Sequence, residues 1–262
     1  MSQNEHKEII AIGDIHGRRQ WRHIVERHPE AHIVFMGDYC DPYEFIGCGR
    51  LLNNLNSIID LKHKEPDRFT LLLGNHDMHY ITKDFPRGTR YDKSLADEIH
   101  ITFHYKRDAF CYAWQYRNLL FTHSGVSKHW LEASFNEDVY PNAADVFNNP
   151  DISDNEREAL FACGKYRGGK DAYGGIFWAD IKEFDSLPEG FIQIAGHNKV
   201  NEIRHLSPTT VSTNKCTDIF ICDCLANFKY LRITIDNDDI CFYEMNLEND
   251  DYTLLAHKCI CP

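Results

Sequence analysis

The chain has 262 residues, of which 43% are hydrophobic and 26% charged, and its formal net charge at pH 7 is -12. The negative balance argues against a duplex nucleic acid partner, which needs a basic surface against its phosphates. It does not exclude a small phosphorylated substrate, because bound divalent cations can reverse the sign of the local field.

No stretch approaches the roughly 20 consecutive apolar residues of a membrane span. The polar start over residues 1–7 lacks the basic and then apolar layout of a signal peptide. We therefore expect a cytoplasmic protein with no membrane partner, and reduced thiols rather than disulfides for its ten cysteines. The chain shows no internal repeat and no low-complexity linker, so residues 1–262 are predicted to form a single domain.

The first part of the chain alternates between apolar runs of strand type and helical periodicity. We expect strands over 8–12, 31–36 and 69–73, separated by amphipathic helices over 21–28 and 51–59. This βαβαβ pattern predicts parallel strands with right-handed crossovers. The carboxyl ends of the three strands then meet at one edge of a sheet, where open α/β sheets bind their ligands.

Further along, helical spacing returns over 94–107, and the segments 110–116 and 119–122 are typical of a hairpin. Residues 126–185 are predicted to be a loop-rich insert with one helix over 153–163, which begins at a capping box of Ser153 and Glu156. Runs at 191–195, 219–222, 230–235 and 240–245 are expected to form a second, mainly antiparallel sheet. The turn between the last two runs is predicted at 236–239.

Five strand ends carry side chains that bind metals. The segments are Gly13-Asp14-Ile15-His16-Gly17, Gly37-Asp38-Tyr39-Cys40-Asp41, Gly74-Asn75-His76-Asp77, Thr122-His123-Ser124-Gly125 and Ala195-Gly196-His197-Asn198. A single Gly-Asp or Gly-His pair at a strand end is usually turn chemistry, and the segment at His197 is the weakest of the five. Five such junctions in one chain favour a shared metal site.

The ligand types and their order suggest how the site is built. Asp14 and His16 can reach one ion, Asp38 can lie between two ions, and three further residues can complete the second: Asn75, His123 and His197. Oxygen and imidazole ligands suit Mn, Fe or Zn, with Mn preferred. Two ions about 3.5 to 4 Å apart would hold a bridging hydroxide for in-line attack on a phosphoester.

His76 follows a ligand without being needed as one. It can therefore protonate the leaving oxygen as a general acid, with Asp41 or Asp77 orienting its ring. Aromatic residues expected near the metals, Tyr43 among them, are interpreted as loop packing rather than as a base-stacking pocket.

These motifs resemble the signature of the calcineurin-like metallophosphoesterases. The resemblance is strongest to the branch that contains phosphoserine/phosphothreonine protein phosphatases and symmetrical diadenosine tetraphosphate hydrolases. It implies a fold of α/β class, a four-layer αββα sandwich of two mixed sheets flanked by helices. It also implies Asp14 and His16 on the first metal, Asp38 bridging, and Asn75, His123 and His197 on the second. By the same resemblance, His76 is the general acid and Asp41 its partner.

The chain departs from this family at one position. The family's second motif ends in Asp-Arg, and its arginine holds the substrate phosphate, whereas Pro42 follows Asp41 here. Loss of a planar guanidinium at such a position matters, because it binds phosphate in a bidentate way. We expect Arg167, or failing that Arg18, to take over this role.

Three functions are compatible with the sequence. The first is hydrolysis of phosphomonoesters, including phosphoserine or phosphothreonine in proteins, and the second is hydrolysis of a dinucleoside polyphosphate. The third is a non-catalytic phosphate-binding scaffold, which the missing arginine suggests. His76 and Asp41 argue against the scaffold, because a scaffold has no need for a general acid beside intact ligands.

Overall fold

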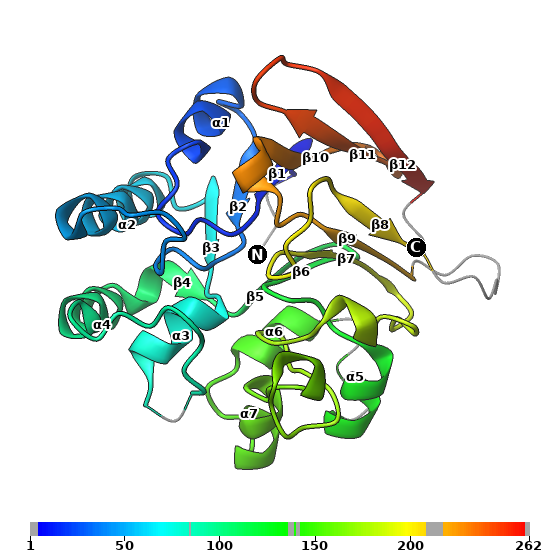
Figure 1. Cartoon of the computed structure of the whole chain (residues 1–262). Helices are drawn as coiled ribbons and strands as arrows, with labels where there is room; N and C mark the ends of the chain where they lie inside the picture. Colours follow the sequence, from blue (N-terminus) through cyan, green and yellow to red (C-terminus); the bar gives the residue numbers. More distant parts are fainter. Residues whose placement is uncertain (1–4, 84, 136–138, 140–141, 208–216, 260–262) are drawn as a thin grey trace.

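The computed structural model describes residues 5–83, 85–135, 139, 142–207 and 217–259. Two mixed sheets face each other, and helices cover the outer face of each (Figure 1). The predicted αββα sandwich is therefore confirmed. That the whole chain forms a single domain stays a prediction.

The first sheet has seven strands in the order β12-β11-β10-β1-β2-β3-β4. Strands β1 to β4 run parallel, as the βαβαβ pattern predicts, and pair through registers such as Ile9 with His32 and Ile33 with Phe69. The strands are β1 (Glu8–Ile12), β2 (His32–Phe35), β3 (Phe69–Leu72), β4 (Phe110–Cys111), β10 (Lys229–Asp236), β11 (Asp239–Asn246) and β12 (Tyr252–Cys259).

The second sheet has five strands in the order β5-β6-β7-β9-β8. Its three central strands are parallel, and the two outer ones are antiparallel to their neighbours. The carboxyl ends of β6 and β7 therefore lie at the same edge. The strands are β5 (Ala113–Tyr116), β6 (Leu119–Thr122), β7 (Phe191–Ala195), β8 (Arg204–Leu206) and β9 (Thr217–Ile221).

Three expectations about the sheets are wrong. The second sheet is not mainly antiparallel, because its central strands β6, β7 and β9 run parallel. The runs 230–235 and 240–245 do not belong to the second sheet, because β10 pairs antiparallel with β1 and extends the first sheet together with β11. Apolar alternation shows that a strand is buried, but it does not show which strand lies beside it. The run 110–116 is not one strand either, since β4 pairs with β3 and β5 pairs with β6. The predicted turn between β10 and β11 is confirmed by the pairing of Asp236 with Asp239.

The predicted helices are present with slightly different ends. Helices α1, α2 and α4 pack on the outer face of the first sheet, and α5, α6 and α7 lie on the side of the second sheet (Figure 1). Ser153 and Glu156 form the expected capping box of α7. The helices are α1 (Trp21–Arg27), α2 (Cys48–Lys64), α3 (Asn75–Ile81), α4 (Ala96–Tyr105), α5 (Lys128–Ser134), α6 (Ala143–Asn148) and α7 (Asp154–Leu160).

Strand alternation divides the apolar side chains between two layers. In β1, Ile9 and Ala11 point between the sheets, while Ile10 and Ile12 contact the helical layer. Residues of the second sheet such as Phe121 complete the core between the sheets. This packing holds both sheets in a fixed relation and brings their carboxyl edges together.

Among the described residues, none of the helices combines the length and the apolar character that crossing a membrane requires.

Candidate metal centre

The five strand-end segments converge at the meeting edges of the two sheets. Their positions follow from the topology, because β1, β2 and β3 end at one edge of the first sheet and β6 and β7 at one edge of the second. All six predicted ligands therefore lie close together. They are Asp14 and His16 after β1, Asp38 after β2, Asn75 at the start of α3, His123 after β6 and His197 after β7.

The first group of possible ligands contains Asp14, His16 and Asp38, all of them buried. Nε2 of His16 lies 3.9 Å from Oδ2 of Asp14 and 3.6 Å from Oδ2 of Asp38. Nδ1 of His16 donates to the backbone carbonyls of Cys40 and Asp41, both at 3.0 Å. Because carbonyls only accept, the hydrogen of the neutral ring is on Nδ1, and the lone pair of Nε2 faces the two carboxylates.

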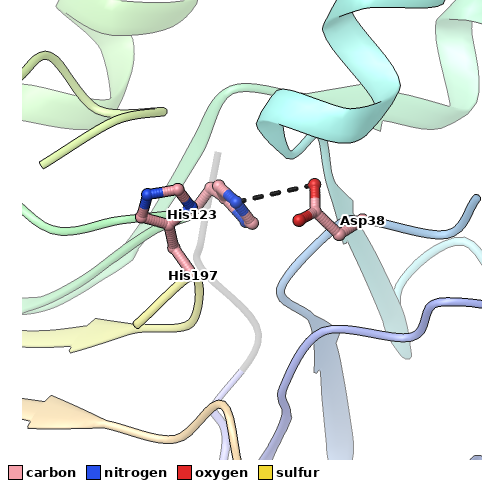
Figure 2. Close-up of side chains that lie close together, drawn as sticks. All are labelled: Asp38, His123 and His197. Atoms are coloured by element: carbon pink, nitrogen blue, oxygen red, sulfur yellow. Dashed lines mark ion pairs between the residues drawn. The ribbon is translucent and has the colours of Figure 1, made fainter. Parts of the chain in front are cut away.

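The second group contains Asp38, His123 and His197 (Figure 2). Nε2 of His123 lies 3.6 Å from Oδ1 of Asp38, and its Nδ1 donates to the carbonyl of Met36 at 2.7 Å. Oδ1 of Asn75 lies 2.9 Å from Nε2 of His123 and 2.9 Å from Nδ1 of His197. Four side chains of the predicted ligand set thus surround this second position.

Asp38 is common to both groups. Its Oδ2 faces His16 and its Oδ1 faces His123, so one carboxylate lies between the two positions. The backbone N–H of His76 donates to Oδ1 at 2.8 Å and fixes the carboxylate in this orientation. A Cβ atom on Gly74 would collide with Oδ1 of Asp38, which explains the glycine before Asn75.

The backbone at this edge is unusual. His16, Asp38, Asp41 and His197 have φ angles of 43°, 53°, 55° and 60°. Residues other than glycine adopt this left-handed region at an energetic cost, and such residues concentrate at functional sites. Three separate strand ends share the feature, so the strained turns aim the side chains at a common centre.

Burial shifts the pKa values of these groups in opposite directions. Burial lowers the pKa of His16 and of His123 to about 3 and that of His197 well below its usual range. The imidazoles are therefore neutral, as metal binding requires. Burial raises the pKa of Asp14 to about 6, and burial together with the charge of Asp14 raises that of Asp38 well above its usual range.

These observations fit bound divalent cations. Two crowded, buried carboxylates are unfavourable in their charged form unless cations lie beside them. Nε2 of His197 is buried and has no hydrogen-bond partner among the described residues, which is costly for a polar atom unless it binds something else. Asp14, His16, Asp38, Asn75, His123 and His197 are therefore suited to holding two ions, and their oxygen and imidazole atoms suit Mn, Fe or Zn.

His76 lies beside the two groups rather than within them. Its ring is 5.2 Å from the ring of His16, centroid to centroid, and its Nδ1 is 2.7 Å from Oδ2 of Asp41. Of the two carboxylates considered as its partner, the structure places Asp41 in contact with it. Asp77 instead accepts hydrogen bonds from the backbone N–H groups of Asp38, Tyr39 and Gly74 and organises that turn.

Sequence reasoning missed two further contacts of Asp41. Nε2 of His79 lies 2.8 Å from Oδ2, and the hydroxyl of Tyr80 donates to Oδ1. Burial alone would raise the pKa of Asp41, but hydrogen bonds from His76, His79 and Tyr80 outweigh it and lower that pKa. His76, His79 and Tyr80 lie three and four residues apart on α3, so recognising a helix that begins at Asn75 would have revealed this shared face.

A third missed residue is Asp223, which follows β9 and is 8% exposed. Burial and the charge of Asp14 raise its pKa well above the usual range. It adds a third buried acid to the first group of ligands. A polar residue at the end of an apolar run was its only sequence signal, and that signal is shared with many turns.

The two arginines proposed from the sequence lie on different sides of the site. Arg167 donates to Oδ1 of Asn198 at 2.5 Å and forms an ion pair with Asp180 at 2.8 Å. After burial, its charge is the largest influence that lowers the pKa of His197. Arg18 is near the other group and donates to the backbone carbonyl of Asp14 at 3.2 Å.

Comparison with known families agrees with this geometry. A model of the calcineurin-like phosphoesterase family matches residues 7–230. The chain therefore belongs to the calcineurin-like phosphoesterases, a family of metal-dependent phosphoesterases. The resemblance inferred from the strand-end motifs is confirmed.

Individual relatives match this chain either over a short segment or at low sequence identity. The catalytic subunit of serine/threonine-protein phosphatase 6 from Drosophila melanogaster is 33% identical over 79 residues, which are 29% of this chain and 24% of that relative. The match thus spans about a quarter of that protein. A structure of a cold-active protein tyrosine phosphatase superposes with a TM-score of 0.57 at 15% identity, over 96% of this chain and 79% of the other. The structure of a mutant cold-active protein tyrosine phosphatase superposes with a TM-score of 0.56 at 14% identity, over 96% of this chain and 81% of the other. Both show a shared fold.

Proposed function

We propose that this protein is a two-metal hydrolase of phosphomonoesters, and that phosphorylated proteins are among its substrates. The observation that carries the proposal is the position of Asp38, whose two carboxylate oxygens each face one group of ligands. A carboxylate shared in this way supports two adjacent ions. Similarity to the catalytic subunit of a serine/threonine-protein phosphatase supports a phosphoprotein substrate. A cytoplasmic location is supported by the sequence alone and stays a prediction.

Each residue has a defined task in this proposal. Bound divalent ions, Mn in the first instance, would supply Lewis acidity and a water activated for attack on phosphorus. Asp14, His16, Asp38, Asn75, His123 and His197 hold the ions. Arg167, on the side of His197, binds oxygens of the phosphate and replaces the arginine that is absent at Pro42.

His76 donates the proton to the departing oxygen from Nε2, because its Nδ1 is held by Asp41. The proton therefore comes from the ring atom that points away from the carboxylate. This arrangement is a general acid with an orienting partner. It also separates the enzyme from a phosphate-binding scaffold, which gains nothing from the pair.

The proposal is tested with purified protein loaded with Mn and a panel of phosphorylated compounds. We expect hydrolysis of an aryl phosphate and of phosphoserine peptides, at rates above those for a dinucleoside polyphosphate. Preferred cleavage of the dinucleoside polyphosphate would favour the nucleotide hydrolase instead. If the protein binds metal but hydrolyses no phosphoester, the result would favour a non-catalytic phosphate-binding scaffold.

Arg167→Ala checks the phosphate contact within the same panel. Loss of a charge-assisted hydrogen bond should raise KM about tenfold. Lys170→Ala, which removes one positive charge from an exposed position of the same loop, is the matched control. Equal KM values for the two variants would remove Arg167 from the phosphate site.

A further inference from the structure

A pocket of about 390 Å³ opens beside His16. Arg18, Arg19 and Arg50 line it, the first two from the loop after β1 and the third from the start of α2, and Tyr43 is also part of the lining. Three arginines thus line a cavity that borders a proposed metal ligand. We call this cavity the arginine pocket.

The arginine pocket has more basic than acidic side chains in its lining, with three arginines and Glu44. Within the described part of the chain, Arg18, Arg19 and Arg50 form no ion pair with a carboxylate, although the whole chain has 40 acidic and 28 basic residues. Glu44 contributes an acidic side chain to the lining. Cations gathered in one cavity repel each other and raise the local concentration of anions.

Two further cations, Arg90 and Lys199, lie over the ring of Tyr43. Tyr43 is 49% exposed, and its ring packs edge-on against the ring of His16, at 4.8 Å between centroids. The guanidinium carbon of Arg90 lies 4.5 Å from the centroid of Tyr43, and Nζ of Lys199 lies 5.5 Å from it. Arg18 is 5.8 Å away. Tyr43 is therefore more than loop packing, because it joins the arginine pocket to the metal centre.

The arginine pocket and the proposed proton donor His76 both lie next to His16. His16 contacts Tyr43 through one edge-on ring contact and the proposed proton donor His76 through another. An oxygen protonated by His76 would therefore lie on the same side of the site as Tyr43. Phe228 and Ile46 add apolar surface to the lining, which suits an organic group between two charges.

We propose that the arginine pocket binds a second anionic group, a phosphate or a carboxylate, on the leaving group of the substrate. Guanidinium forks match the oxygens of both anions. The inference rests on the proposed function, because it requires a phosphoester at the metal centre. The preferred substrate is then a phosphoester with a second anionic group besides its phosphate, which we call a doubly anionic substrate.

A kinetic experiment compares substrates that differ only in the second anion, with the protein loaded with Mn. One pair is glucose monophosphate and glucose bisphosphate, and the other is a phosphoserine peptide with neighbouring glutamates and the same peptide with alanines. The wild type should show a lower KM for the doubly anionic member of at least one pair. The pair that responds identifies a small bisphosphate or an acidic peptide as the source of the second anion.

Arg50→Ala tests the arginine pocket directly. Loss of one charge-assisted contact should raise KM for the doubly anionic substrate about tenfold, and so reduce the preference over its singly anionic counterpart. Lys64→Ala removes one positive charge from the other end of α2, outside the lining, and should keep the preference.

Binding without turnover provides a second readout. Titration calorimetry with butylphosphonate and with alkyl bisphosphonates of increasing length measures the effect of the second anion on affinity. The wild type should bind a bisphosphonate of suitable length about tenfold more tightly than butylphosphonate, and Arg50→Ala should lose that difference. Hydrolysis of aryl phosphate without any preference for a second anion, in kinetics and in binding, would overturn the arginine pocket and leave the proposed function intact. Failure to hydrolyse every phosphoester would instead overturn the proposed function.

Discussion

Nδ1 of His76 lies 2.7 Å from Oδ2 of Asp41, and both side chains are buried. A carboxylate at this distance orients the ring and keeps the hydrogen of the neutral ring on Nδ1, so that Nε2 is the atom turned away from Asp41. The pair lies beside the proposed ligands and outside their two groups, so its chemistry can be tested separately from metal binding.

Asp41→Asn should lower kcat about a hundredfold to ten-thousandfold, the range for loss of general acid catalysis. The loss should be larger for phenyl phosphate than for dinitrophenyl phosphate, because a good leaving group needs little protonation. Steady-state kinetics with both esters measures the difference, and elemental analysis checks that metal content is retained. An equal loss for the two esters would remove Asp41 from proton transfer.

Tyr80→Phe removes one of the donors that hold Asp41 and should lower kcat about tenfold for phenyl phosphate. Tyr80 acts through Asp41, so this effect should also shrink for dinitrophenyl phosphate. Tyr91→Phe deletes a hydroxyl from the ring stacked on Tyr80 and serves as the control. Similar kinetics for the two variants would mean that the hydroxyl of Tyr80 does not position Asp41.

The strand-end motifs could be predicted from the sequence because their signals are local. A glycine and a polar residue after an apolar run mark a strand end wherever the strand lies in the sheet. The partner of β10 could not be predicted, because Leu231 and Ile233 alternate in the same way beside β1 as they would in the second sheet. His79 and Tyr80 were missed because their role depends on a helix that begins immediately at Asn75.

Gly74→Ala should weaken metal binding by displacing Asp38, since the added Cβ would collide with Oδ1 of its carboxylate and with the ring of His123. We expect at least about a tenfold rise in the dissociation constant for Mn, a change of about 1.4 kcal/mol, measured by calorimetry on metal-free protein. Gly49→Ala, which has open space around its Cβ, should leave the affinity unchanged. Unchanged binding in Gly74→Ala would contradict the position of Asp38.

Asp218→Asn should destabilise the fold away from the metal centre. Burial would raise the pKa of Asp218, but hydrogen bonds from His205, Ser207 and Lys258 outweigh it and lower that pKa to about 2. A depressed carboxyl pKa stabilises the fold above the unfolded-state pKa near 4, and the contribution disappears as the pH falls through the folded-state pKa. We expect a loss of about 2 kcal/mol in unfolding free energy at pH 7.

Urea unfolding of wild type and Asp218→Asn between pH 7 and pH 2 measures this contribution. The difference between them should narrow below about pH 4 and be small near pH 2. Asp238→Asn, in the exposed turn between β10 and β11, controls for the change in net charge. A difference that does not depend on pH would show that the ionised carboxylate of Asp218 is not what stabilises the fold.

Asp38 lies between both ligand groups, so metal content and hydrolysis of aryl phosphate in Asp38→Asn test the two-metal account most directly. An asparagine there offers one oxygen and no charge. We predict two Mn ions per wild-type chain, fewer than two in Asp38→Asn, and a loss of turnover of at least about a thousandfold with an unchanged circular dichroism spectrum. Two bound Mn ions and undiminished turnover in Asp38→Asn would contradict the two-metal account.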